Sequence, residues 1–134
     1  MANNDEPGAQ SPFRGIEDMI DTGRLHHRAG NYEQAEDLYW QAMREDQTHP
    51  EPYHLLGMIA LQAGKLEPAR QLVQTAQELD DGNPVYHANM GAVHYQAGEP
   101  EAAEAAYRRA VELDPDYAEA QFNLGILLKE QGRY

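Results

Sequence analysis

A pair of glycines seven residues apart returns every 34 residues along this chain, and this repeat limits the fold more than any other feature. The pairs account for eight of the eleven glycines: Gly23 and Gly30, Gly57 and Gly64, Gly91 and Gly98, Gly125 and Gly132. Sequence periods of about 20 to 50 residues are typical of units that cannot bury their apolar face alone and therefore stack on their neighbours. The sequence predicts a repeat protein.

Each period is predicted to hold two helices. Apolar and small residues recur at three- and four-residue spacing on both sides of the second glycine of each pair, as in two helices joined by a tight turn. That second glycine is expected to take the left-handed backbone that ends the first helix. The first glycine lies in mid-helix, where it costs about 1 kcal/mol relative to alanine, so a close helix contact is expected there. The small residues expected across each hairpin are Ala35, Ala69 and Ala103.

The repeats set the predicted domain boundaries. Residues 16–134 are predicted to form repeats 16–49, 50–83 and 84–117 and the first helix of a fourth, 118–134. Residues 1–15, which are rich in Asn, Asp, Pro, Gly and Ser, are predicted to be a flexible lead-in. Leu124 and Leu128 on the last helix would normally be covered by a following helix. We therefore expect that helix to pack on another copy or to be poorly ordered, and we interpret the chain as part of a longer protein.

The composition excludes several classes of function. Ten Lys and Arg against 23 Asp and Glu give a net charge of −13, which disfavours binding to nucleic acid and to anionic membrane surfaces. The chain has no cysteine, so disulfides and thiolate chemistry are absent. Neither a signal peptide nor a membrane-spanning run is recognisable, and a cytoplasmic location is the expectation.

No catalytic or metal site is predicted. Among the six histidines, His87 and His94 are seven residues apart on one side of a predicted helix, and His26 occupies the same repeat position as His94. That side of the helix is expected to face a neighbouring helix. Partly buried, hydrogen-bonded aromatic side chains are therefore expected there. Ser11 is the only serine, and no glycine-rich phosphate loop or paired acid and base is recognisable. We predict a chain without enzymatic activity, cofactor or metal.

These residues resemble the tetratricopeptide repeat, a 34-residue helix-turn-helix unit. The motif positions carry Leu56-Gly57, Met90-Gly91 and Leu124-Gly125, the turn glycines and the three alanines named above, Tyr39, Val73 and Tyr107, and Pro115. The chain departs from the pattern where His87 replaces the usual Trp and Thr22 the usual Leu. The amino-acid sequence of the first two repeats is similar to that of the N-terminal repeats of large bacterial tetratricopeptide proteins, some of which carry a C-terminal glycosyltransferase domain.

The resemblance implies an all-α, right-handed solenoid of antiparallel helix pairs whose concave face, lined by the first helix of each pair, binds a protein or peptide. Asn89 and Asn123 occupy the position of an asparagine ladder in the related transferase, which can hydrogen-bond an extended backbone. The predicted partner-binding residues on this face are Arg24, His27, Leu55, Met58, Leu61, Asn89, Tyr95 and Asn123.

Three functions remain open on the sequence alone. The first is a protein-interaction module that binds a peptide in its groove, and the second is the N-terminal recognition arm of a larger enzyme such as a glycosyltransferase. The third is a self-associating scaffold, with the homo-oligomer formed through the last helix. Binding of chaperone C-termini is not expected, because only Asn89 fits the family's two-carboxylate clamp, whose other positions hold Ile20, Arg24, Leu55 and Val85.

Overall fold

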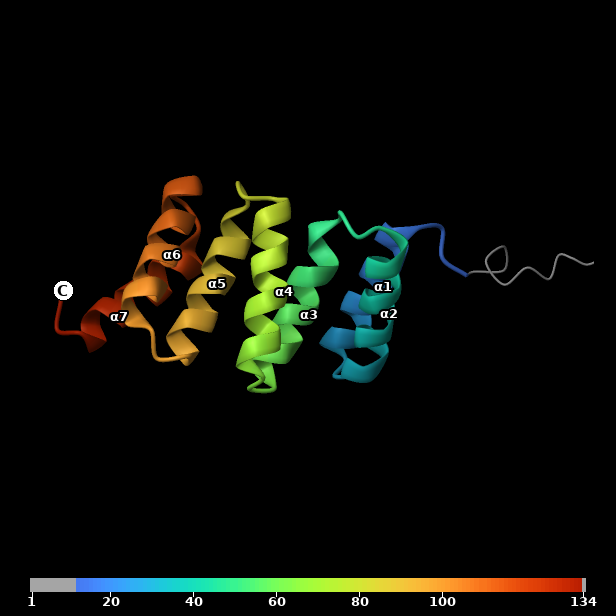
Figure 1. Ribbon diagram of the computed structural model, residues 1–134, viewed down its shortest axis with the longest axis horizontal. Helices are drawn as coiled ribbons and strands as arrows, with labels where there is room; N and C mark the ends of the chain where they lie inside the picture. The colour runs from blue at the N-terminus through green and yellow to red at the C-terminus, as the bar shows by residue number, and fades with distance from the viewer. Residues whose placement is uncertain (1–11, 134) are drawn as a thin grey trace, which may run out of the picture. The chain divides into compact units, whose positions relative to one another are not determined.

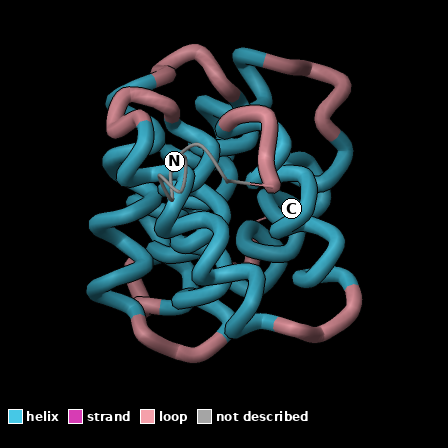
Figure 2. Tube along the Cα trace, turned by 90° about the vertical axis from the view of Figure 1, so that its right-hand side faces the viewer, coloured by secondary structure: helices cyan, strands magenta, loops and turns pink. Residues whose placement is uncertain are grey.

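The computed structural model describes residues 12–133, and every regular element within them is an α-helix (Figure 2). In chain order these are α1 (Ile16–Arg28), α2 (Tyr32–Glu45), α3 (Pro50–Gln62), α4 (Leu66–Leu79), α5 (Pro84–Gln96), α6 (Pro100–Leu113) and α7 (Ala118–Glu130) (Figure 1). The predicted all-α class, with three helix pairs and a further helix, is confirmed. The odd-numbered helices are called A helices below and the even-numbered ones B helices. The predicted lead-in lies mostly outside the described residues, as does Tyr134.

The described residues fall into two compact units, which are treated separately. Unit 1 extends to Gln47 and contains the hairpin of α1 and α2. Unit 2 begins at Thr48 and contains the hairpins α3–α4 and α5–α6, followed by α7. Within unit 2 each helix packs against the next one in the chain, and the A helices α3 and α5 also touch. This packing brings the A helices of successive repeats together.

Local sequence sets where the helices begin and end. Pro50, Pro84 and Pro100 each occupy the first helical position, where the missing N–H breaks no helical hydrogen bond. The Asn83 side chain caps α5 by accepting a 2.9 Å hydrogen bond from the Val85 N–H. The turn glycines take positive φ values of 84°, 78°, 76° and 73° at Gly30, Gly64, Gly98 and Gly132. The predicted left-handed helix ends are therefore confirmed.

The mid-helix glycines allow close packing in the three hairpins, but their neighbours are larger than expected. A Cβ atom added at Gly91 would lie 2.7 Å from the Tyr107 ring, and one at Gly57 would lie 2.7 Å from Val73. Tyr39 stands at the same place opposite Gly23. The nearest side chains are thus the large residues 16 positions on, and not the alanines that the sequence analysis expected. Glycine is needed because a bulky side chain from the B helix fills the space.

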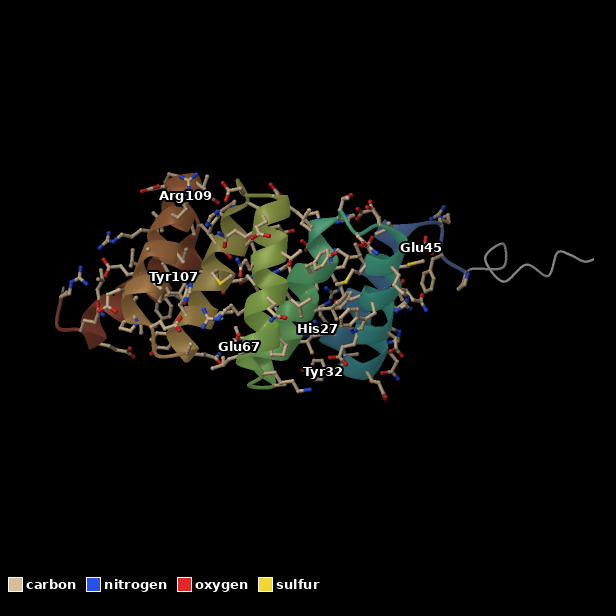
Figure 3. All side chains as sticks on the ribbon, in the orientation of Figure 1. His27, Tyr32, Glu45, Glu67, Tyr107 and Arg109 are labelled. Carbon is tan, nitrogen blue, oxygen red and sulfur yellow. The ribbon has the colours of Figure 1, made fainter. Side chains whose placement is uncertain are left out.

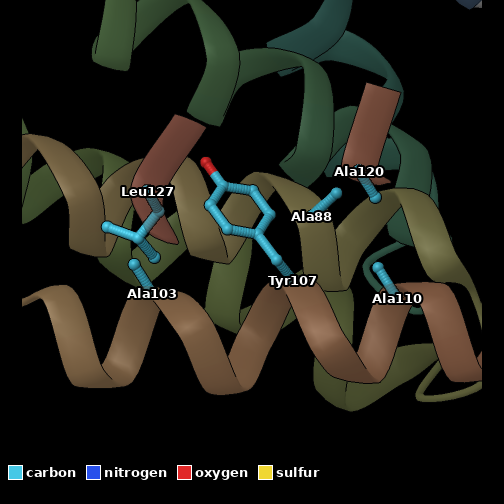
Figure 4. Packing of buried hydrophobic residues seen from close by; sticks show 6 residues of the cluster. All are labelled: Ala88, Ala103, Tyr107, Ala110, Ala120 and Leu127. Atoms are coloured by element: carbon cyan, nitrogen blue, oxygen red, sulfur yellow. The ribbon is translucent and has the colours of Figure 1, made fainter. Parts of the chain in front are cut away.

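The core of unit 2 consists of two clusters that each span three helices. One joins Leu61 of α3, Ala69 and Val73 of α4, and Met90 and Val93 of α5. The other surrounds the Tyr107 ring with Ala88, Ala103, Ala110, Ala120 and Leu127 (Figure 4). Leu127 and Ala120 hold α7 against α6, because both are almost fully buried. The last helix is therefore packed on its inner side.

The prediction for the outer side of α7 needs correction. Leu124 is half-buried against the Tyr107 cluster, and Leu128 is also half-buried. The large apolar residues that are exposed on this helix are Phe122, at 68%, and Ile126, at 37%. The reason is the direction of the helix face, since Leu124 and Leu127 turn toward α6 while Phe122 points away from it.

Two ion pairs connect the successive repeats of unit 2. The Arg70 guanidinium of α4 donates to Glu99, just before α6, at 3.1 Å, and His94 Nδ1 lies 2.7 Å from the same carboxylate. One repeat later, Glu104 replaces Arg70 and Arg133 replaces Glu99, and this pair is 2.7 Å long. The hydrogen bond with His94, and then Arg70, lower the pKa of Glu99, while Arg133 and then Arg108 lower the pKa of Glu104. The same position thus carries an ion pair of reversed polarity in consecutive repeats.

Candidate interaction surface

The candidate surface of unit 2 is built by the A helices α3, α5 and α7. The structure places six of the predicted residues here, namely Leu55, Met58 and Leu61 on α3, Asn89 and Tyr95 on α5, and Asn123 on α7. The helices repeat with the period of the sequence, so equivalent positions fall on equivalent faces. Asn89 and Asn123 are one repeat apart and both are half-buried.

The apolar part of this surface is smaller than predicted. Leu55 is only 9% exposed, and Leu61 is 7% exposed and belongs to the core cluster with Val73. Met58 is half-buried at the edge of that cluster, and Tyr95 is 41% exposed. Because Leu55 and Leu61 pack as core side chains, the accessible apolar residues of the predicted set in unit 2 are Met58 and Tyr95.

Asn89 lies in a polar cluster between α3 and α5. Its Nδ2 atom is 2.6 Å from Nδ1 of His54, whose ring contacts the Tyr86 ring at a centroid distance of 5.2 Å. The Tyr86 hydroxyl donates a 2.5 Å hydrogen bond to Glu51. With the amide placed in this way, the His54 nitrogen accepts one N–H of Asn89. The Asn89 oxygen and its second N–H remain to interact with a ligand.

Asn123 and Tyr95 differ in their contacts. Within residues 12–133 the side-chain amide of Asn123 has no hydrogen-bond partner, although it is half-buried. The Tyr95 hydroxyl donates to both carboxylate oxygens of Glu130 at 2.8 Å. This hydrogen bond raises the pKa of Tyr95, with burial as the second cause. Tyr95 is thus fixed as a neutral hydrogen-bonded ring, while Asn123 presents an amide with open donor and acceptor groups.

Sequence analysis missed four residues that contact or support this surface: Glu51, His54, Tyr86 and Glu130. Their contacts share a signal that the sequence does contain. Tyr86 and Glu51, Asn89 and His54, and Tyr95 and Glu130 are each separated by 35 residues. This spacing is one residue more than the repeat, and it joins adjacent A helices. Searching the repeats for polar pairs at this spacing could have found all three contacts.

Arg24 and His27, the remaining predicted residues, lie on α1 in unit 1. Arg24 donates to Asp21 on the same helix at 3.3 Å, and both side chains are substantially exposed. The His27 ring packs edge-on against Tyr32 at the start of α2, with ring centroids 5.2 Å apart (Figure 3). Both predicted residues on α1 therefore already contact neighbouring side chains.

The histidine stripe behaves as the sequence analysis expected. His87 is 6% exposed, and its Nε2 lies 2.6 Å from the carbonyl oxygen of Asp81. His94 is half-buried beside Glu99. Among residues 12–133, no three His, Asp or Glu side chains are grouped as a metal site requires. None of the described helices is long and apolar enough to cross a bilayer.

Comparison with known families gives one consistent result. Residues 26–92 match the tetratricopeptide repeat, and residues 94–132 match a TPR repeat. The longer match covers half of the 134 residues. No curated protein sequence matches the chain.

Solved structures with a similar fold include three of different kinds. A mutant of the O-GlcNAc transferase from Thermobaculum terrenum is 27% identical, with a TM-score of 0.82 over 96% of this chain and 23% of the transferase. The first TPR of Spaghetti (RPAP3), bound to the HSP90 peptide SRMEEVD, is 21% identical with a TM-score of 0.81, over 89% of this chain and 94% of that one. MamA is 20% identical with a TM-score of 0.78, over 96% of this chain and 72% of that one. The last two likenesses show the fold alone, and this chain spans 23% of the length of the transferase.

Proposed function

Since this chain belongs to the tetratricopeptide repeat family, we propose that it is a protein-interaction module that binds an extended peptide segment along the A helices of unit 2. Its repeats, and structural neighbours of which one is bound to a peptide, support this class of function. The observation that carries the proposal is the pair of half-buried asparagines, Asn89 and Asn123, at equivalent positions of α5 and α7.

An asparagine pair of this kind suits a peptide backbone. Each side-chain amide offers donors and an acceptor, as a backbone amide group does, so it pairs with the backbone whatever the ligand's side chains are. Packed helices lie about 10 Å apart, and an extended peptide advances about 3.3 Å per residue. Consecutive ladder asparagines would therefore contact backbone groups about three residues apart.

The charges of the surface favour a neutral or basic segment. Glu51 and Glu130 belong to the same A helices or to their neighbours, and they accept hydrogen bonds from Tyr86 and Tyr95. The positions of the family's carboxylate clamp carry Leu55 and Val85 in place of basic or amide side chains. An acidic peptide such as SRMEEVD would meet these two carboxylates, and like charges brought together disfavour binding. We infer that this peptide, which is bound by the Spaghetti domain, does not bind here.

The test is selection of peptides from a displayed library, followed by titration of a selected peptide against variants. We expect Asn123→Ala and Asn89→Ala to weaken binding about 5- to 10-fold each, as loss of a net hydrogen bond of about 1 kcal/mol implies. Asn31→Ala is the matched control, because Asn31 is an exposed asparagine of unit 1 whose side chain caps no helix. SRMEEVD serves as the negative ligand. Equal affinity of the two ladder variants and the wild type would refute the asparagine ladder.

A second candidate is the recognition arm of a larger glycosyltransferase. It is supported by the likeness to the Thermobaculum terrenum O-GlcNAc transferase, the most similar in sequence of the three structures described above. The test is to sequence the gene beyond residue 134. A glycosyltransferase domain in the same reading frame supports this candidate, whereas a stop codon directly after residue 134 rejects it.

A further inference from the structure

His54 of α3 holds the side-chain amide of Asn89 on α5. Its Nδ1 atom lies 2.6 Å from Nδ2 of that amide. A ring nitrogen that accepts a hydrogen bond carries no proton, so the neutral imidazole has its N–H on Nε2. The contact therefore directs one N–H of Asn89 to His54 and leaves the amide oxygen, on the other arm of the fork, as an acceptor.

The imidazole ring is itself held by neighbouring side chains. It contacts the Tyr86 ring, with centroids 5.2 Å apart and an angle of 44° between the planes. Tyr86 is 2% exposed, and its hydroxyl donates a 2.5 Å hydrogen bond to Glu51, one helical turn before His54 on α3. A side chain that is already held in this way has little conformational freedom left to lose when a ligand binds. Glu51, Tyr86 and His54 thus form a chain of contacts that ends at Asn89.

The other ladder position lacks this support. One repeat after His54 stands Ala88, which is 5% exposed and belongs to the core cluster around Tyr107. A methyl side chain neither donates nor accepts a hydrogen bond. Ala88 therefore cannot select between the two orientations of the Asn123 amide in the way that His54 selects one for Asn89. The two asparagines occupy equivalent repeat positions, but they differ in what holds them.

We propose that His54 is a positioning residue of the peptide surface, and that it fixes the Asn89 oxygen as the acceptor for a backbone N–H of the bound segment. The inference rests on the proposed function and adds to it a direction for one hydrogen bond. Asn123, which His54 does not reach, pairs with either a backbone N–H or a backbone C=O. The register of the bound segment is therefore set at Asn89.

The specificity that follows concerns the peptide backbone. The segment must present an N–H at the residue that meets Asn89. Proline has no backbone N–H, so a segment with proline at this residue leaves the Asn89 oxygen unpaired and is disfavoured. At Asn123 the same exclusion does not hold, because that amide is able to donate to a carbonyl oxygen instead.

The first test needs no peptide. In the chain labelled with 15N, an N–H···N hydrogen bond between Asn89 Nδ2 and His54 Nδ1 produces a scalar coupling between the two nitrogens. The ring nitrogen shifts of His54 report at the same time whether Nδ1 is unprotonated, at about pH 8, where an ordinary imidazole is neutral. We expect both signals in the wild type. A wild type with a protonated Nδ1 and no coupling to Asn89 overturns the positioning role, whether or not a peptide binds.

The second test uses the peptide selected from the displayed library, with each backbone N–H in turn replaced by an ester oxygen. At one position the ester should weaken binding to the wild type about 5- to 10-fold, as loss of one hydrogen bond implies. The same ester should have no further effect on binding to Asn89→Ala. His54→Ala should weaken binding of the unmodified peptide about 2- to 10-fold, because the Asn89 amide must then be ordered by the ligand.

A double-mutant cycle separates positioning from a general structural role. In the Asn89→Ala background, His54→Ala should have no further effect on affinity, whereas a structural defect would persist there. His94→Ala is the matched control, because His94 is a half-buried histidine of α5 whose partner is Glu99, and its affinity should equal that of the wild type. Circular dichroism checks that each variant is folded.

The outcomes distinguish this inference from the proposed function. Additive effects of His54→Ala and Asn89→Ala, or an ester scan in which no position depends on Asn89, overturn the positioning role. Affinity that depends on Asn89 and not on His54 overturns it as well, but leaves the asparagine ladder intact. A peptide whose affinity is unchanged by both Asn89→Ala and Asn123→Ala refutes the ladder itself.

Discussion

Replacement of Gly91 by alanine separates the effect of close helix packing from that of helix propensity. A Cβ atom at Gly91 would lie 2.7 Å, 2.8 Å and 3.0 Å from three carbon atoms of the Tyr107 ring. Carbon atoms in contact are normally about 3.5 to 4.0 Å apart, so the ring would have to retreat by roughly 1 Å. Tyr107 is 3% exposed and packed among Ala88, Leu127 and other core residues, which leaves it little room to move.

The size of the effect follows from two opposing contributions. Overpacking of a core costs about 1 to 3 kcal/mol, while alanine in a helix interior is favoured over glycine by about 1 kcal/mol. We therefore expect Gly91→Ala to lower the free energy of unfolding by up to about 2 kcal/mol. Gly125→Ala gains the same propensity without any clash, because no other atom lies within 4 Å of its added Cβ. The difference between the two variants, about 1 to 3 kcal/mol, isolates the steric cost.

The assay is urea unfolding followed by circular dichroism, with hydrogen exchange of the α7 amides to detect local stabilisation by Gly125→Ala. These two variants carry the same chemical change at equivalent positions of successive repeats, so each is the control for the other. In a Tyr107→Ala background the Gly91→Ala change should no longer destabilise, which a double-mutant cycle would register as coupling of about 1 to 3 kcal/mol. The packing argument is refuted if Gly91→Ala and Gly125→Ala change stability equally, or if the cycle shows no coupling.

Two further predictions concern charge and pH. Arg70→Glu should cost about 0.5 to 1 kcal/mol by setting two carboxylates side by side, and Glu99→Arg in the same chain should recover at least half of it, as measured by urea unfolding. If the double variant loses as much free energy of unfolding as the two single variants lose together, the pairing is contradicted. Burial raises the pKa of Tyr107 to about 12, so the folded state favours the neutral phenol. The neutral Tyr107 phenol therefore stabilises the folded state. This stabilisation is present below the ordinary tyrosine pKa of about 10 and is lost as pH rises toward 12, by up to about 2 kcal/mol. The thermal midpoint should therefore fall more steeply over this range in the wild type than in Tyr107→Phe, and parallel curves would contradict the assignment.

Much of the fold could be predicted from the sequence because it depends on local rules. The 34-residue period fixed the number and order of helices, and the turn glycines with positive φ stand where the pattern placed them. Glycine adopts that backbone without steric cost, so its position in the sequence already indicates the turn. The burial of His87 likewise followed from its place on the inner stripe of a helix.

The candidate surface was predicted less completely, because its residues are brought together across repeats. Contacts inside the hairpins were also predicted incompletely: the side chain that faces Gly91 is Tyr107 and not Ala103, because the angle and offset of two packed helices decide it. Periodicity assigns a residue to a helix face, but it does not say whether another helix covers that face. Leu55 and Leu61 are therefore more buried than their spacing suggested.

The sequence by itself determined which residues form helices, where the helices turn, and that a protein or peptide is the expected partner. Only the tertiary structure decided which polar groups are engaged. It showed that Asn89 already contacts His54 and that Tyr95 is held by Glu130. The physical reason is that helix formation depends on neighbours within about four residues, whereas these contacts join side chains 35 residues apart.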